Sequence, residues 1–404
     1  MMSTFADLEY GSDKFVSVKD HGAVGDGHHD DTVALQSCFD NFAGSDVVFW
    51  IPHGHYILTQ TLVIPSNARI VGEVWPVLLG TGAYFQDSNR PQAVIQVGRV
   101  PGEQGRAEIS ECIFSTKGSC PGAIVLRWNL AASSAGQMPG MWDTHIRLGG
   151  FIGSNLDDQR FDKDKPLQTK DAWACFLAWH LPRESAGCFV NNWVWLADHT
   201  LDTSSASRHA GTQISLLASR GILIESNPGP VLLWGGASEH FLLYQYQINE
   251  ARNVFIGAAQ TESPYFLGEG VSLPSELAPP VAGAPWHDPT WKAGSGSFDA
   301  RSWGFRIRRS SHTHVYGPGL YSFFDAYKQE KLVSRTCQRA VMSVEDCNTP
   351  TAGSPSDEEN VNNVTLVGLS TVGTKSMLDR DGKEMVAEEP HRNGFSSTYG
   401  YWLC

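Results

Sequence analysis

The 404-residue sequence predicts an all-β protein, a single-stranded right-handed parallel β-helix with one capping helix at its N-terminus. Brief apolar strands alternate with turns rich in Gly, Pro and Asn, and strand–turn–strand units recur about every 20–25 residues. The chain holds 40 glycines and only 18% charged residues, so long amphipathic helices are few. Coils that contact only their neighbours allow a chain of this length to form a single domain.

The chain begins with a polar lead-in over residues 1–14, and we interpret residues 15–404 as one β-helix domain. A strand starts at Phe15 and is followed by a glycine-rich turn that ends in Asp30 and Asp31, either of which can cap a helix.

The predicted helix has an apolar face at helical spacing, formed by Leu35, Cys38, Phe39 and Phe42. One such helix at the start of a β-rich chain would cover the open end of a solenoid.

Short strands follow from Val47 onward, at 47–52, 56–59, 61–65, 69–72 and 93–98. Strands this short and frequent fit a sandwich, a barrel or a β-helix, and fit neither a doubly wound sheet nor a helical bundle. Repetition favours the β-helix, because residues 222–235 align without gaps on residues 244–257. Two segments, 268–300 and 348–360, are predicted to be long loops that project from the coils.

Charge and hydropathy narrow the classes of partner. A formal net charge of −13 disfavours nucleic acid and other polyanions and favours a neutral substrate. No apolar run approaches the ~20 residues of a membrane span, so no membrane partner is expected. The first fifteen residues lack the regions of a secretory signal. The eight cysteines leave free thiols and disulfides equally open.

Two glutamates stand at equivalent points of successive repeats. Glu239 and Glu262 are 23 residues apart, and each follows a glycine-ended apolar strand. Stacked coils lie ~4.8 Å apart, so two carboxylates one coil apart would raise the pKa of one of them. A protonated acid near neutral pH is what glycoside hydrolysis requires. The alternative is that both are ordinary polar residues at a coil edge.

Several motifs resemble known sequences. The opening VKDHGAVGDGHHDDT (18–32) resembles the entry motif of the pectate-lyase-like β-helix superfamily. Together, these segments are similar to fungal glycoside hydrolase family 55, the exo-β-1,3-glucanases: IVGEVW (70–75), MWDTHIRLGG (141–150), WVWLADH (193–199), ASEHFLLYQY (237–246), QTESPYF (260–266) and GLYSFF (319–324).

The resemblance implies an exo-type, inverting hydrolase of β-1,3-glucan with Glu262 as general acid and Glu239 beside it. Family members carry two β-helices with the active site in the cleft between them, and this chain is similar only to the second. A second chain or a homodimer is therefore a candidate for completing the cleft. The family also implies an extracellular location. Carboxylates one coil apart are too close for simple two-carboxylate inversion, which requires ~6.5–9.5 Å, so the attacking water must be held by another group.

The expected substrate-binding residues surround these acids in the sequence. His240 could orient Glu239. Side chains at alternating positions of a strand lie on the same face, so they can contact the same substrate. Aromatic rings can stack on sugar faces, although core ladders have the same pattern. The predicted set is His240, Trp193, Trp195, Asp198, His199, Tyr244, Tyr246 and Tyr265. No cofactor and no metal site are expected.

Two other functions remain open at this point. One is a non-catalytic glucan-binding or scaffold protein that has lost the first β-helix. The other is a polysaccharide lyase, which typically needs Ca²⁺ and a basic residue near the acids. The negative net charge and the absence of a basic motif near residues 230–270 count against the lyase.

Overall fold

The computed structural model describes residues 14–133, 137–166, 170–202, 211–268, 286–289, 302–347, 363–391 and 401–403, the last for the backbone only. Residues 1–13 of the predicted lead-in lie outside these ranges, as do the predicted loop at 348–360 and most of that at 268–300.

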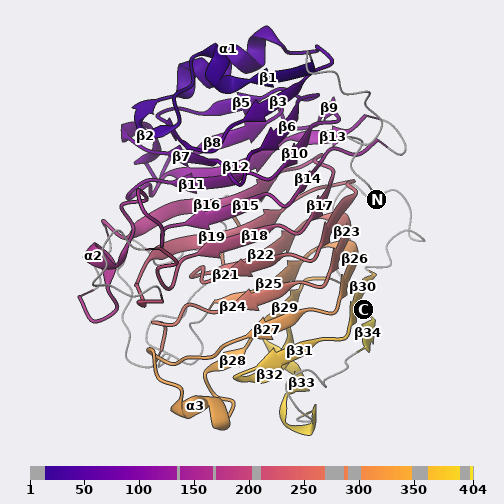
Figure 1. Ribbon diagram of the computed structural model, residues 1–404. Coiled ribbons are helices and arrows are strands. Elements are labelled where there is room, and N and C mark those ends of the chain that lie inside the picture. Colours follow the sequence, from indigo (N-terminus) through magenta and orange to yellow (C-terminus); the bar gives the residue numbers. More distant parts are fainter. Residues whose placement is uncertain are drawn as a thin grey trace.

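The chain winds through three parallel sheets that run the length of the molecule, which confirms the predicted parallel β-helix (Figure 1). Most coils contribute one strand to each sheet, and consecutive coils pair in parallel. Antiparallel pairs occur at the C-terminal end, where β34 pairs with β30 and β33 pairs with β32.

Sheet A consists, in spatial order, of β1 (Phe15–Ser17), β3 (Val48–Ile51), β6 (Arg69–Gly72), β10 (Glu108–Ser110), β14 (Gly140–Trp142), β17 (Gly187–Val190), β20 (Val231–Trp234), β23 (Arg252–Gly257), β26 (Ser311–Tyr316), β30 (Val364–Val367) and β34 (Tyr401–Leu403). Sheet B consists of β2 (Asp26–Asp30), β4 (His55–Leu58), β7 (Val77–Gly80), β11 (Ile113–Thr116), β15 (His145–Leu148), β18 (Trp193–Leu196), β21 (Ala237–Glu239), β24 (Gln260–Glu262), β27 (Gly319–Tyr321) and β31 (Ser370–Val372).

Sheet C consists of β28 (Gln338–Ala340), β32 (Thr374–Arg380), β29 (Met342–Glu345), β25 (Trp303–Arg308), β22 (Tyr244–Asn249), β19 (Leu217–Ile224), β16 (Trp173–Leu181), β12 (Ala123–Trp128), β8 (Gln92–Val97) and β5 (Leu62–Ile64), with β33 (Lys383–Ala387) beside β32. A small separate sheet joins β9 (Glu103–Gly105) and β13 (Leu130–Ala132).

The predicted capping helix is α1 (Thr32–Asn41), which lies over the N-terminal end of the coils (Figure 1). Leu35, Cys38 and Phe39 are buried as expected. The cap bond comes from Asp30, whose carboxylate accepts from the backbone N–H of Thr32 at 3.0 Å. The remaining helices are short: α2 (Asp158–Phe161), α3 (Glu330–Val333), η3 (Val18–His21), η4 (Ala83–Phe85) and η6 (Glu389–His391).

One corner of the coil is built identically in seven successive coils, from β10/β11 to β30/β31. In each, two residues join the strand of sheet A to the strand of sheet B. The first of the two is always left-handed: Glu111, Asp143, Asn191, Gly235, Ala258, Gly317 and Gly368. Gly, Asn and Asp adopt this conformation with the least strain, which explains the turn residues seen in the sequence. Because this corner is constant, the seven sheet-B strands from β11 to β31 each begin at the same distance from the end of the preceding sheet-A strand.

The gapless alignment of residues 222–235 on 244–257 was wrong in register. The structure pairs Ile222 with Tyr246, where the alignment placed Tyr244, and pairs Val231 with Val254, one residue later than expected. The 23-residue spacing of the two glutamates does match, since Glu239 pairs with Glu262. Sheet-C strands and the turns beside them vary in length, so a fixed offset does not hold around a whole coil.

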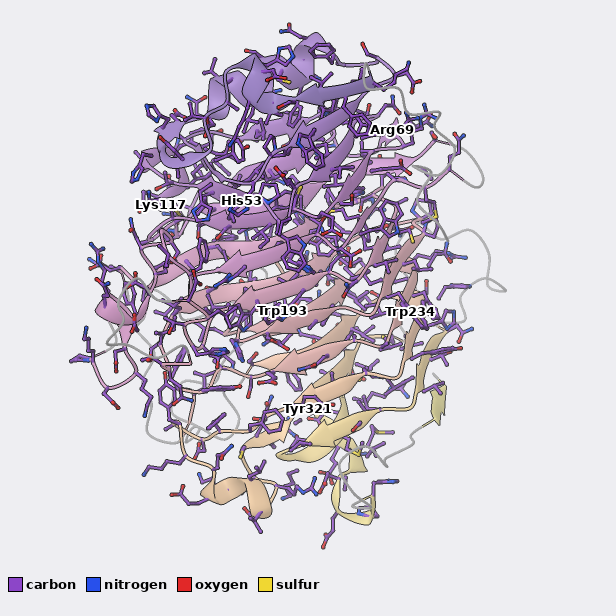
Figure 2. All side chains as sticks on the ribbon, viewed as in Figure 1. His53, Arg69, Lys117, Trp193, Trp234 and Tyr321 are labelled. Atoms are coloured by element: carbon purple, nitrogen blue, oxygen red, sulfur yellow. The ribbon has the colours of Figure 1, made fainter. Side chains whose placement is uncertain are left out.

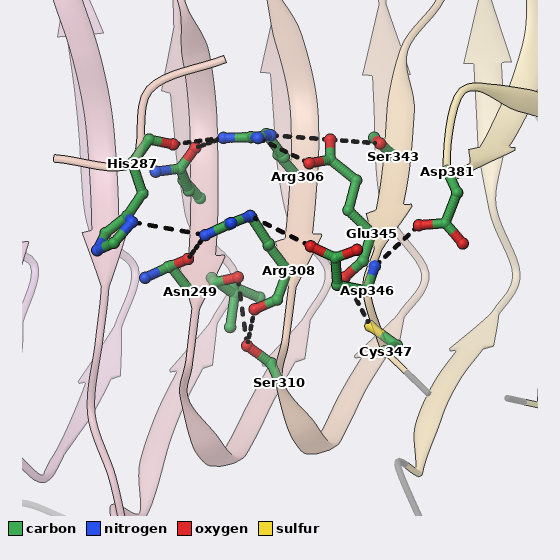
Figure 3. Close-up of polar contacts among 12 residues, drawn as sticks. Asn249, His287, Arg306, Arg308, Ser310, Ser343, Glu345, Asp346, Cys347 and Asp381 are labelled. Atoms are coloured by element: carbon green, nitrogen blue, oxygen red, sulfur yellow. Dashed lines mark hydrogen bonds and ion pairs between the residues drawn. The ribbon is translucent and has the colours of Figure 1, made fainter. Parts of the chain in front are cut away.

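Residues 286–289 lie against the outer face of sheet C, held by the buried arginines Arg220 and Arg306. Arg306 makes a two-point ion pair with Glu345 and also donates to the carbonyl of His287, while Arg308 donates to Asn249 (Figure 3). Charge-assisted bonds of this kind fix geometry where polar groups leave water. The Arg306 bond joins this short piece of the segment between β24 and β25 to the coil after the two glutamates, and the ion pair of Arg220 with Asp288 joins it to a coil before them.

Candidate active site

Four neighbouring strands of sheet B, β18, β21, β24 and β27, form the surface that holds the glutamates. Their middle residues Val194, Ser238, Thr261 and Leu320 are buried in the interior. By alternation, the first and third residues of the three-residue strands face outward. The third positions stack in one ladder across the coils: Trp195, Glu239, Glu262 and Tyr321.

The two carboxylates share one donor, the side-chain amide of Gln260. Its Nε2 donates to Glu239 Oε1 at 2.9 Å and to Glu262 Oε1 at 3.3 Å. Trp193 donates from Nε1 to the other oxygen of Glu239 at 3.0 Å. Tyr265 donates from its hydroxyl to Glu262 Oε2 at 2.7 Å. Small residues make room for these contacts, since Ala237 pairs directly with Trp193.

The shared donor limits the separation of the acids. The two Oε1 atoms can be no farther apart than the sum of their distances to Gln260 Nε2. That sum is shorter than the ~6.5 Å at which inverting carboxylate pairs begin. The nearest oxygens of the pair are thus too close for an inverting water between the two carboxylates.

His240 lies beneath the pair. It follows Glu239 in the left-handed conformation, with φ of +73°, an uncommon state for a residue with a side chain. Its Nδ1 donates to the carbonyl of Leu196 at 2.8 Å, and its Nε2 lies 3.5 Å from Glu262 Oε2, an ion-pair contact. The sequence placed His240 beside Glu239, whereas its ring faces Glu262.

Burial and charge shift the titration of these groups. Burial lowers the pKa of His240, but the Glu262 carboxylate and the charges of Asp198 and Glu239 outweigh it and raise the pKa to about 9. Burial raises the pKa of Glu239, which is 6% exposed; His240 opposes this effect and Glu262 adds to it. The cluster therefore holds an imidazolium ion at neutral pH next to a carboxyl group that resists ionisation.

The WVWLADH segment lines one side of the cluster. The rings of Trp193 and Trp195 stack at 4.8 Å, and Trp195 is buried below the surface. Asp198 bonds to His199 at 3.0 Å and lies 3.7 Å from His240. Burial raises the pKa of Asp198, but the bond from His199 and the charge of His240 outweigh it and lower the pKa. Asp198 is thus an anionic support for His240.

Tyr265 and the two other tyrosines of the predicted set have different locations. Tyr265 packs edge-on against His240 and reaches Glu262. Tyr244 and Tyr246 lie in β22 of sheet C and are fully buried; Tyr246 stacks on Phe305 with centroids 4.5 Å apart. The structure does not bring these two rings to the outer face of sheet B, so they are core residues here.

Two residues of this surface are absent from the predicted set. Gln260 bridges the acids, and Tyr321 follows Glu262 in the ladder, its hydroxyl folded over Gly319, where a Cβ would lie 2.4 Å from it. The signal for Gln260 was present, since it stands two positions before Glu262 on the same strand.

Among the residues that the structure describes, no three or more His, Cys, Asp or Glu side chains are arranged to hold a metal. In the same ranges, no helix is long and apolar enough to cross a membrane. Cys112 and Cys120, close enough in sequence to pair, are buried free thiols.

Comparison with known proteins relates the chain to glucanases. The family "Rhamnogalacturonase A/epimerase, pectate lyase-like" matches residues 15–114. The sequence is 38% identical over 390 residues to a "Probable glucan endo-1,3-beta-glucosidase" of Arthroderma benhamiae, covering 96% of this chain and 41% of that protein. It is 33% identical over 394 residues to a "Glucan 1,3-beta-glucosidase" of Cochliobolus carbonum, covering 96% of this chain and 46% of that protein.

Among solved structures, sacteLam55A from Streptomyces sp. SirexAA-E superposes with a TM-score of 0.54 and 13% sequence identity, covering 97% of this chain and 54% of that one. This likeness shows the fold alone. The chain spans less than half the length of the two curated relatives described. The chain folds as a parallel β-helix, matches a pectate lyase-like family over residues 15–114 and is similar over nearly all its length to two fungal proteins named as glucan 1,3-beta-glucosidases, in agreement with its resemblance to glycoside hydrolase family 55.

Proposed function

We propose that the chain is the acid-bearing β-helix of a β-1,3-glucan hydrolase, in which Glu262 protonates the leaving glycosidic oxygen. The observation that carries the proposal is the stacked pair Glu239 and Glu262 on the outer face of sheet B, bridged by Gln260. The relatives named as glucan glucosidases support the substrate class.

Exposure supports assigning different roles to the two acids. The side chain of Glu262 is 15% exposed and has Tyr265 and His240 around one oxygen, so a sugar can reach it. Glu239 is more deeply buried, and its pKa is raised by that burial. We assign Glu262 to substrate contact and Glu239 to holding Trp193 and Gln260 in place while limiting the negative charge of the pair.

The aromatic surroundings fit a neutral sugar chain. Trp193 and Tyr321 lie on either side of the acids along the axis of the coils (Figure 2). Rings such as these pack on the apolar faces of sugars while their polar edges bond to hydroxyls. Exo-type attack and inversion follow from the family resemblance and are part of the proposal.

Inversion requires a second group that the close pair does not supply. A base must activate water on the opposite face of the sugar, farther from the acid than Glu239 lies. We assign that group to a polypeptide opposite sheet B, either a second chain or a second copy of this one. The relatives, more than twice as long as the part matched here, support a companion segment.

The test is hydrolysis of laminarin by the wild type and by Glu262→Gln, with the product anomer followed by NMR. We expect Glu262→Gln to lower the rate by at least about 10²-fold, since it cannot donate a proton, and we expect the α-anomer to form first. Glu330→Gln, in α3, is the matched control and should retain full activity. An equally active Glu262→Gln would overturn the assignment.

A second candidate, a non-catalytic glucan-binding protein, is favoured by one observation: the chain spans less than half of its curated relatives. Binding of laminarin without release of sugar, by the chain alone and with added partner, would select this function over hydrolysis.

A further inference from the structure

Sheet A carries an exposed aromatic group that the acid cluster does not use. It consists of Trp234 at the end of β20, Phe255 in β23 and Tyr316 at the end of β26, and we call it the sheet-A platform. Trp234 is 51% exposed and Tyr316 is 41% exposed, which is unusual for residues this large. Figure 2 shows Trp234 over sheet A, apart from Trp193 and Tyr321 on the sheet-B face.

The indole of Trp234 lies across the next coil. Trp234 pairs with Gly257, and a Cβ built on Gly257 would lie 2.4 Å from Cε3 and 2.5 Å from Cζ3 of that indole. Both ring atoms therefore sit directly over the glycine, and only a residue without a side chain permits this contact. One side of the ring rests on the backbone, while about half of the residue's surface stays exposed.

The neighbouring rings extend this surface along the axis of the coils. The rings of Phe255 and Trp234 are almost parallel, 7° apart, with centroids separated by 6.2 Å. Tyr316 pairs with Gly257 from the following coil and packs edge-on against Phe255 at 5.3 Å. Trp234 and Tyr316 are thus two coils apart, ~9.6 Å, so a chain bound along the axis would contact more than one ring.

The size of the platform argues for a polysaccharide over a protein. A stable protein interface buries about 800 Å² on each partner, whereas an aromatic side chain contributes about 150–250 Å² when fully buried. The surface that Trp234, Tyr316 and the partly buried Phe255 can offer together is well below that area. Flat aromatic rings match the apolar faces of β-linked glucose, and the negative charge of the chain disfavours an acidic polysaccharide.

We propose that the sheet-A platform is a second binding surface for a neutral β-glucan, distinct from the acid cluster, which holds the chain on its polymer. The identity of the glucan as β-1,3-linked rests on the proposed function, but the presence of a sugar-binding surface does not. A surface of this kind acts on insoluble polymer, where the local concentration of substrate limits hydrolysis, and has no effect on short soluble oligosaccharides.

The test is co-sedimentation with curdlan, an insoluble β-1,3-glucan, beside hydrolysis of soluble laminari-oligosaccharides. Trp234→Ala should weaken curdlan binding about tenfold, and Trp234→Ala with Tyr316→Ala should weaken it further. Gly257→Ala should act like Trp234→Ala, because the new methyl group displaces the indole without removing it. Tyr84→Ala is the matched control, since Tyr84 is 44% exposed near the N-terminal end.

Glu262→Gln separates this proposal from the proposed function. We expect it to bind curdlan like the wild type while it loses hydrolysis; if no variant hydrolyses glucan but Trp234→Ala still loses binding, only the proposed function fails. Unchanged curdlan binding in the double variant would overturn the platform. So would a drop in oligosaccharide hydrolysis equal to the loss of binding, or a wild-type dimer, detected by sedimentation, that Trp234→Ala dissociates.

Discussion

His240 links the stability of the fold to pH, and His240→Gln tests that link. The pKa of His240 is raised from 6.5 to about 9 by the carboxylates around it. A histidine with a raised pKa stabilises the folded state fully below its unfolded pKa, near 6.5, and loses that contribution as pH rises through about 9. The variant should therefore lose stability at pH 6 relative to the wild type and lose much less at pH 10.

The magnitude follows from the shift. A difference of about 2.5 pKa units corresponds to about 3 kcal/mol, because each unit is worth about 1.4 kcal/mol. The pH-dependent part of the difference in free energy of unfolding between wild type and variant should fall from about 3 kcal/mol at pH 6 to about 1 kcal/mol at pH 8 and close to zero at pH 10. Any cost of repacking the site adds the same amount at every pH. Urea denaturation at these three pH values, with two-state fits, measures it.

The control for this experiment is His28→Gln, which changes an exposed histidine in the first sheet-B strand. Its unfolding free energy should run parallel to that of the wild type across the same pH range. If the difference between wild type and His240→Gln does not change with pH, His240 carries no extra proton in the folded state, and the electrostatic account of the cluster is refuted.

Three further predictions concern single contacts. Arg220→Met should lower the free energy of unfolding by about 3–5 kcal/mol, because it leaves Asp288 buried without its two-point partner, and Asp288→Leu in the same chain should restore much of it; urea denaturation measures both. Gln260→Leu should cost about 1–3 kcal/mol in the same assay, since partly buried oxygens of both glutamates lose their donor. Tyr265→Phe should slow laminarin hydrolysis about tenfold by removing the bond to Glu262, while Tyr246→Phe should leave the rate unchanged; equal effects would contradict the locations of the two rings.

The periodicity of the sequence was enough to predict the stacking of the acids. Glu239 and Glu262 are separated by one coil, and the constant two-residue corner before each strand carries that spacing into register. The same reasoning failed for sheet C, where Ile222 pairs with Tyr246 and not with Tyr244. Strand lengths vary in that sheet, and local spacing does not encode the variation.

Aromatic pairs show a second limit of sequence reasoning. Trp193-Val-Trp195 and Tyr244-Gln-Tyr246 have the same alternation, yet the first lies beside the acids and the second is buried in or under sheet C. Alternation did not place the two tyrosines together either, since Tyr246 packs in the main core whereas Tyr244 belongs to a separate cluster covered by Trp286. The direction of the His240 ring could not be predicted from the sequence either. It depends on a left-handed backbone conformation at this residue, which the residue type does not indicate.

The repeated corner between sheets A and B makes the position of the chemistry independent of the length of the molecule. Seven coils turn that corner in the same two steps, so an entire coil could be gained or lost between two others without rotating those that remain. A single residue inserted at Gly235 would instead shift Glu239 to the opposite face of its strand and leave Glu262 without its neighbour. The solenoid can thus be lengthened or shortened by whole coils. An insertion of less than a coil between Glu239 and Glu262 would separate the acid pair.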